Sequence, residues 1–249
     1  MSSSTSLTKA SKAPKAGTSA VPIDVLHKDT AKLYTHIHPI LLLSLYVFQF
    51  KSIVADPVPA LVNTLIALGV LQIAYVSICL PPTGGSATPA PVARAGGKKK
   101  TAPGKLESGI QGKIIPAFLS LLLSTLAGTP VLAITLVLFG APLTTHHAHT
   151  VLCAAHISFL AVLPAIYVYG VEGEKWRQIV AMFLPIDEVF GAMIGTVLGA
   201  WLGAVPIPLD WDREWQKWPV TIVTGAYIGY AVGKLLGGTL LKGKKIMFE

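Results

Sequence analysis

The sequence predicts an all-α membrane protein, a polytopic bundle of about six transmembrane helices. Hydrophobic residues make up 52% of the 249 residues and charged residues only 13%, whereas a soluble domain carries about 25% charged residues. The apolar residues gather in long segments, and most basic residues lie in the gaps between them. These observations indicate that lipid, and not a single soluble core, covers most of the apolar surface.

Six segments have the length of roughly 20 mostly apolar residues that a helix needs to cross the hydrocarbon layer. They cover residues 33–54, 58–80, 114–139, 151–170, 188–205 and 219–241. The fifth segment is the shortest. In the third, Pro130 lies near the middle and removes a backbone donor, so we expect a kink there. The third segment could also be read as two shorter helices.

The composition divides the chain into five parts. We expect a disordered basic N-terminal tail (1–30), a transmembrane hairpin (31–80), a disordered basic cytosolic linker (81–112), a four-helix core (113–241) and a cytosolic tail (242–249). The linker is rich in Pro, Gly and Ala and includes Lys98-Lys99-Lys100, a composition that does not bury enough apolar surface to fold. No cleavable signal peptide is visible, so the first helix is expected to act as the insertion signal.

The basic residues predict the orientation. With six crossings, 17 of the 20 Lys and Arg residues fall on one side, and only Lys51, Arg213 and Lys217 fall on the other. The positive-inside rule places the basic side, with both termini, in the cytosol. The same distribution argues against nucleic-acid binding despite the net charge of +8. Cys79 and Cys153 are then near opposite faces of the bilayer, too far apart for a disulfide.

The fifth and sixth segments each carry four glycines at four-residue spacing. These are Gly191, Gly195, Gly199 and Gly203, and Gly225, Gly229, Gly233 and Gly237. Residues four apart share one helical face, and glycine there lets another backbone approach closely. The two rows either pack on each other or face another subunit.

Histidines cluster in the segment that leads into the fourth helix. Thr144 or Thr145 is expected to cap that helix. The helical spacing then puts four side chains in one stripe: His146, His149, Cys153 and His156. With His147 beside it, this stripe could bind zinc, contact a lipid headgroup or a partner, or serve packing alone.

A second polar segment precedes the sixth helix, and its notable residues are Asp210, Trp211, Asp212, Arg213, Glu214, Trp215, Lys217 and Trp218. Tryptophans suit a membrane interface, and those at 211, 215 and 218 would dip together if the segment is helical. The acidic residues could bind a divalent ion or pair with the two basic residues in a solvated loop. On the opposite side, Asp187-Glu188 is expected to cap the fifth helix.

No set of residues supports catalysis. The sequence contains no hydrolase triad, Walker loop or paired-acid signature, so we expect no catalytic residue, no metal and no cofactor.

The strings FGAPLTTHHAHTVLCAAH (139–156) and GAWLGAVPIPLDWDREWQKWP (199–219), with the glycine row 225–233, resemble the PIG-F family of glycosylphosphatidylinositol (GPI) anchor biosynthesis proteins, particularly its fungal members. The resemblance covers roughly the last 130 residues, while the first two helices fit in pattern only. It implies a multi-pass protein of the endoplasmic reticulum membrane. It also implies a non-catalytic subunit that binds and stabilises large polytopic ethanolamine-phosphate transferases, which act on the lumenal side.

We therefore expect the histidine stripe and the loop 210–218 to form one lumenal patch that contacts the transferase or a membrane lipid headgroup. Two alternatives remain open. One is a carrier or flippase for phosphatidylethanolamine or a GPI intermediate, and the other is a histidine-dependent metal enzyme that modifies lipids.

Overall fold

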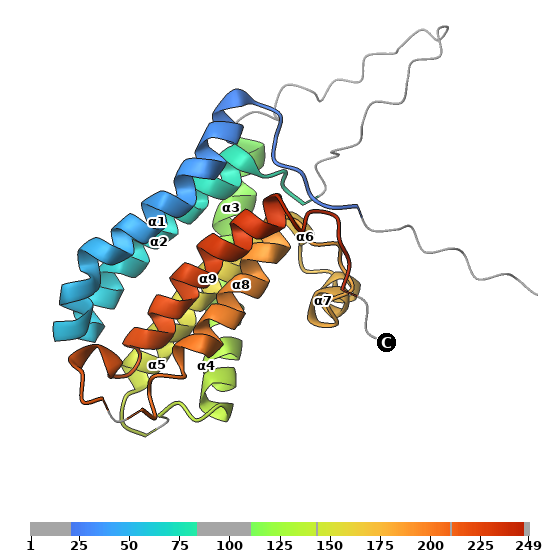
Figure 1. Cartoon of the computed structure of the whole chain (residues 1–249). Helices are drawn as coiled ribbons and strands as arrows, with labels where there is room; N and C mark the ends of the chain where they lie inside the picture. The colour runs from blue at the N-terminus through green and yellow to red at the C-terminus, as the bar shows by residue number, and fades with distance from the viewer. Residues whose placement is uncertain (1–20, 84–110, 143, 210, 247–249) are drawn as a thin grey trace, which may run out of the picture.

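The computed structural model describes residues 21–83, 111–142, 144–209 and 211–246, and within these ranges the chain is helical and contains no strand (Figure 1). This confirms the predicted all-α class. The lysine triplet 98–100 and Asp210 lie outside the described residues.

The first two helices form the predicted hairpin. Helix α1 (Asp29–Ala55) and α2 (Pro57–Cys79) are separated by Asp56 alone. Pro57 begins α2, where its fixed φ favours a helix and its missing N–H leaves no intrahelical bond unmade. The hairpin packs on α9 through α1 and on α5 through α2, so it is part of the bundle and not a separate unit.

The third apolar segment is one continuous helix with a change of winding. It comprises α3 (Gln111–Leu123), the π-helical turn η1 (Ser124–Gly128) and α4 (Thr129–Leu138). The next segment repeats this plan with α5 (His147–Ile157), the π turn η2 (Ser158–Val162) and α6 (Leu163–Tyr169). Pro130 and Pro164 are each the second residue after a π turn. The wider winding of a π turn relieves the clash of a proline ring with the preceding helical turn.

The two π turns lie against each other. The Ser158 hydroxyl donates to the Ser124 carbonyl oxygen at 2.8 Å, and Gly128 leaves the space that the Ser158 side chain occupies. Ahead of Pro130, where the sequence predicts a kink, the structure therefore has a π turn that is hydrogen-bonded to the neighbouring helix.

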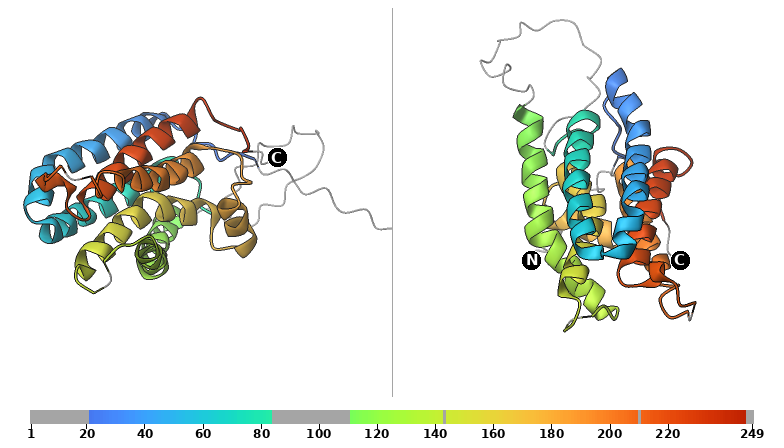
Figure 2. Two further views of the ribbon diagram at one scale, coloured as in Figure 1. Left: turned by 60° about the horizontal axis from the view of Figure 1, so that its bottom comes forward. Right: turned by 90° about the vertical axis from the view of Figure 1, so that its left-hand side faces the viewer.

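The chain ends with the short amphipathic helix α7 (Gly173–Val180), then α8 (Glu188–Gly203), the 3₁₀ turn η3 (Glu214–Gln216) and α9 (Val220–Gly238). Of the six predicted spans, five are long and apolar enough to cross a membrane, and α8 is an apolar helix of 16 residues. The helix His147–Tyr169 is mostly buried and lies between the hairpin and α9 on one side and α3–α4 on the other (Figure 2).

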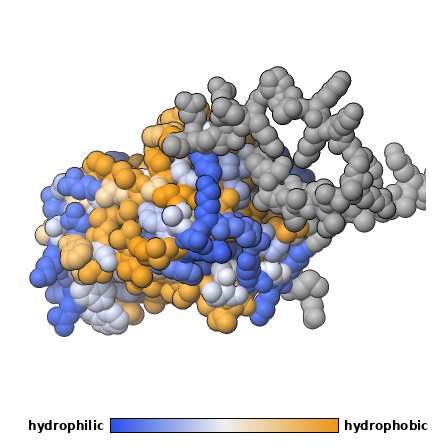
Figure 3. Space-filling model, turned by 90° about the horizontal axis from the view of Figure 1, so that it is seen from above, coloured by the Kyte–Doolittle hydropathy of each residue, from blue (hydrophilic) through white to orange (hydrophobic). Residues whose placement is uncertain are grey.

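The helix termini define two ends of the bundle. We call the end with the starts of α1, α3 and α8 the tail end, and the end with Asp56 and the loops 139–146 and 204–219 the loop end (Figure 1). The outer helix faces are rich in exposed large hydrophobic side chains, which cover much of the surface in Figure 3. Such a surface fits a surrounding of lipid.

The tail end is more ordered than the composition predicts. Residues 21–28, expected in a disordered tail, form an extended segment in which Leu26 N donates to Cys79 O at 2.8 Å. At the other terminus, Gly243 N donates to Ile186 O at 2.7 Å, and Ile186 N donates to Lys244 O at 2.8 Å. Cys79 and Cys153 are both free and buried.

Candidate functional site

The two glycine rows meet along the whole contact of α8 with α9, and we call these eight residues the glycine seam. A Cβ atom on Gly191 would lie 2.6 Å from Gly233 O, and one on Gly195 would lie 2.7 Å from Gly233 Cα. No real Cβ fits at such distances, so every position of the seam requires glycine. Of the two readings left open by the spacing, the structure has the rows packed on each other.

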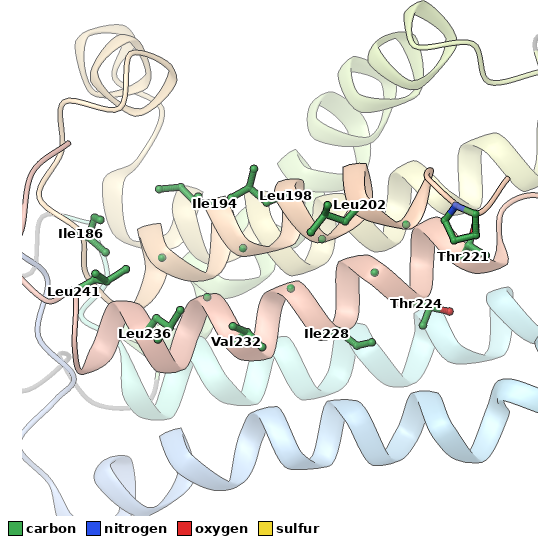
Figure 4. A pocket seen from close by; sticks show the side chains of 18 of the residues that line it. Ile186, Ile194, Leu198, Leu202, Thr221, Thr224, Ile228, Val232, Leu236 and Leu241 are labelled. Carbon is green, nitrogen blue, oxygen red and sulfur yellow. The ribbon is translucent and has the colours of Figure 1, made fainter. Parts of the chain in front are cut away.

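A long apolar groove lies over the glycine seam. Its volume is about 700 Å³, and it runs from Ile186 and Leu241 at the tail end to Pro206 and Trp215 at the loop end. Figure 4 shows the side chains of Ile194, Leu198 and Leu202 from α8 on one side of this groove and those of Ile228, Val232 and Leu236 from α9 on the other. Seven of the eight seam glycines line this groove.

The histidine stripe is divided between surface and interior. His146 and His147 are exposed, and the rings of His146 and His149 lie 5.0 Å apart. Cys153 and His156, in contrast, are fully buried. The prediction that the whole stripe contributes to a surface patch is therefore wrong, because the later turns of α5 are packed inside the bundle.

The threonine cap is also a wrong prediction. Helix α5 begins at His147, and its N-cap residue is His146, which makes no side-chain capping bond. Thr145 Oγ1 instead lies 2.9 Å from His146 Nδ1. Among the described residues no group of three His, Cys, Asp or Glu side chains could hold a metal ion.

The segment 211–218, which we call the tryptophan loop, has one short 3₁₀ turn (Glu214–Gln216), so its three tryptophans do not share a face. Trp211 and Trp215 pair with ring centroids 5.9 Å apart, while Trp218 packs against the core. Glu214 and Lys217 form an ion pair at 2.9 Å, and this hydrogen bond lowers the pKa of Glu214. Asp212 and Arg213 are exposed, and of the pairs expected in a solvated loop the described residues contain that of Glu214 with Lys217.

The helix cap and its neighbour have different roles. Asp187 caps α8, since its Oδ1 accepts from Val189 N and Phe190 N, each at 2.9 Å. Its Oδ2 accepts from Ile23 N at 2.9 Å and from the Tyr169 hydroxyl at 3.0 Å. Asp187 therefore ties together the N-terminal segment, α6 and α8.

Glu188 forms a buried ion pair that the sequence analysis does not predict. Its Oε1 accepts from the ammonium of Lys234, from the Thr35 hydroxyl and from the Tyr75 hydroxyl at 2.9 Å. Lys234 is only 3% exposed, and its Nζ lies 3.8 Å from the centre of the Tyr75 ring. A lysine inside the apolar stretch of α9 is the sequence signal that could have indicated such a pair.

Residues 37–238, which contain the glycine seam, the ion pair and most of the hairpin, match the GPI biosynthesis protein family Pig-F. The chain belongs to the Pig-F family.

The Pig-F chain is similar to several fungal proteins. It is 46% identical to glycosylphosphatidylinositol anchor biosynthesis protein 11 of Aspergillus fumigatus over 88% of this chain and 82% of the relative. It is 43% identical to the protein of the same name from Neurospora crassa, over 90% and 80% of the two chains. Similarity at 41% identity also extends over 47% of this chain to a PIGF/3-ketodihydrosphingosine reductase fusion protein of Schizosaccharomyces pombe, of which it covers 24%. No solved structure matches the chain.

Other buried polar groups of the Pig-F chain lie deeper in the bundle. His38 is fully buried and stacks on Tyr75 with ring centroids 4.4 Å apart, and Gln72 is also fully buried. Neither His38 nor the Gln72 amide has a side-chain hydrogen-bond partner among the described residues. These groups extend the polar interior from the ion pair toward the middle of the bundle.

Proposed function

We propose that this Pig-F chain acts in GPI-anchor biosynthesis as a non-catalytic membrane subunit that binds and stabilises ethanolamine-phosphate transferases. The endoplasmic reticulum membrane is the location that this role requires. The names of the fungal relatives support the pathway. The observation that carries the subunit role is the apolar groove over the glycine seam.

The groove fits a transmembrane helix of the transferase as its occupant. It follows α8 and α9 from one end to the other, and its walls are aliphatic. In lipid, helices associate by close packing, which is best where small residues let backbones approach. A passing helix could therefore lie against the open floor of the seam between two rows of branched side chains.

The loop end offers a second contact for the same partner. His146, His147, Trp211, Asp212 and Arg213 are exposed at this end of the bundle. If the termini are cytosolic, as the basic residues predict, these side chains face the lumen, where the transferase chemistry is expected. His156 and Trp218 take no part in this surface patch, because His156 is buried and Trp218 packs on the core.

The two alternative functions receive less support. A metal enzyme would need a ligand cluster, and the described residues contain none. A carrier would need a polar cavity at mid-membrane depth, whereas the polar side chains of His38, Gln72 and His156 are packed without exposure.

The test is co-purification of the tagged chain with the transferases from solubilised membranes. We expect Leu198→Trp and Ile228→Trp, which fill the groove from its two walls, to reduce the recovered transferase about tenfold. Ile134→Trp is the matched control, since Ile134 is 62% exposed on a different helix. Equal recovery with the groove variants and the control would exclude the groove as the docking site, and absence of transferase from the wild-type purification would exclude the proposed function.

A further inference from the structure

A second hollow lies between α1 and α9 at the tail end, and we call it the lateral pocket. Its volume is about 370 Å³. Polar residues line one part of it, namely Thr35, His36, Glu188, Lys234 and Thr239. Apolar residues line the rest, among them Pro39, Ile40, Leu43, Val232 and Leu235. We infer that the lateral pocket binds a phospholipid whose headgroup carries a primary ammonium, with this ammonium on Glu188 Oε2.

One oxygen of Glu188 is left for a ligand. All three donors, from Lys234, Thr35 and Tyr75, converge on Oε1. Within the described residues, Oε2 accepts no hydrogen bond, although the carboxylate has room for about four acceptor contacts. Because Glu188 lines the lateral pocket, a donor that enters the pocket can reach this oxygen.

The charge of the site selects a ligand without net charge. The ion pair of Glu188 with Lys234 is neutral as a whole, and Lys234 is almost completely buried. Adding a bare cation or an anionic headgroup would leave an uncompensated charge in a poorly hydrated place, which is costly. A zwitterionic headgroup supplies an ammonium for Oε2 together with its own phosphate. The ring of His36, which lines the same pocket, is a donor of the kind that a phosphate accepts.

The walls favour a primary ammonium over a quaternary one. Proteins recognise quaternary ammonium groups with cages of Trp, Tyr and Phe, and none of these residue types lines the lateral pocket in the described part of the chain. The nearby Tyr75 ring already carries the ammonium of Lys234. A primary ammonium instead donates hydrogen bonds, which a free carboxylate oxygen accepts.

The depth of the pocket also fits a headgroup. Glu188 is the first residue of α8, and Lys234 lies in the last turns of α9, so the polar part is close to one membrane surface. The apolar part continues along α1 through Ile40 and Leu43, where an acyl chain would run toward the middle of the bilayer.

Gly238 provides a variant that blocks the site without breaking the ion pair. A Cβ atom placed on Gly238 would lie 3.8 Å from Glu188 Oε2, which is ordinary contact. Gly238→Leu should therefore cover this oxygen and narrow the pocket, and Gly238→Ala should do so partially. Gly173→Leu is the matched control, because a Cβ atom there meets nothing within 4 Å.

The experiment reconstitutes the purified full-length chain in nanodiscs made from equal parts of dioleoyl phosphatidylethanolamine and dioleoyl phosphatidylcholine, and native mass spectrometry counts the lipids that stay bound. We expect the ethanolamine lipid to be retained about tenfold over the choline lipid, and Gly238→Leu to remove this preference while Gly173→Leu keeps it. N,N-Dimethyl phosphatidylethanolamine, with one N–H left, should fall between the two.

Equal retention of both lipids by the wild-type chain, or an unchanged preference in Gly238→Leu, would overturn the inference. The measurement uses no transferase, so its outcome is separate from that of the proposed function. A chain that retains the ethanolamine lipid but does not recover transferase would support the lateral pocket and exclude the subunit role.

Discussion

The glycine seam and the histidine stripe are the two most unusual patterns of the sequence, and they differ in how well they predict structure. The seam repeats one residue at the helical period, and all eight members lie in one helix contact. The histidine stripe (His146, His149, Cys153 and His156) also follows helical spacing, but the structure exposes its first residue and buries its last two. A repeat of the smallest residue therefore predicts a close helix contact here, whereas helical spacing of polar residues does not predict which of them reach the surface.

The largest expected effect comes from a side chain placed in the seam. Gly195→Leu would bring a Cβ atom 2.7 Å from the backbone of Gly233, so α8 and α9 must separate. We expect a loss of at least about 3 kcal/mol in the free energy of unfolding, measured by thermal unfolding in detergent. Gly173→Leu on α7 should leave the unfolding temperature unchanged, and a seam variant as stable as this control would show that the helices are not held by backbone contact.

Breaking the buried ion pair should cost a similar amount of stability. Glu188→Ala leaves the Lys234 ammonium without its carboxylate, and removal of one partner from a buried pair costs about 3–5 kcal/mol. Replacing both residues, as in Glu188→Ala with Lys234→Met, should recover most of this loss because no charge is left buried. If the double variant is as unstable as the single one, packing and not charge explains the effect.

A smaller effect is expected at the helix cap. Asp187→Ala removes the acceptor for Val189 N and Phe190 N and also releases Ile23 N. Loss of such a cap costs about 1–2 kcal/mol, and limited proteolysis should cleave residues 21–28 faster than in the wild type. Asp187→Asn keeps an acceptor oxygen and should protect this segment better; identical cleavage of both variants and the wild type would contradict the assigned role.

The histidine segment should give the smallest change in stability. Replacing His146, His147 and His149 by Ala removes mostly exposed side chains, so we expect a change within about 0.5 kcal/mol. If the loop end contacts the transferase, as proposed, the same triple variant should still reduce the transferase recovered with the tagged chain. Unchanged recovery and unchanged anchor assembly would remove this patch from the proposed contact.

The comparison also separates what can be predicted from sequence in this chain from what cannot. Apolar length predicts the helices, and Pro57 predicts the tight hairpin, because both act locally. The ion pair joins Glu188 to Lys234 across 46 positions, and only the packing of α8 on α9 decides that these two charges face each other. The order of residues 21–28 likewise depends on Asp187 and on the end of α2, both distant in the chain.

The glycine seam has a consequence for motion. Because the backbones of α8 and α9 are in contact at every turn, the two helices cannot slide or roll over each other without steric clashes. We therefore expect them to move as one rigid body. A rearrangement on partner binding would then occur elsewhere, and we expect the paired π turns that begin at Ser124 and Ser158 to act as the hinge. The distance between two spin labels, one on each side of these turns, should change when the partner binds. The distance between a label on α8 and a label on α9 should stay the same.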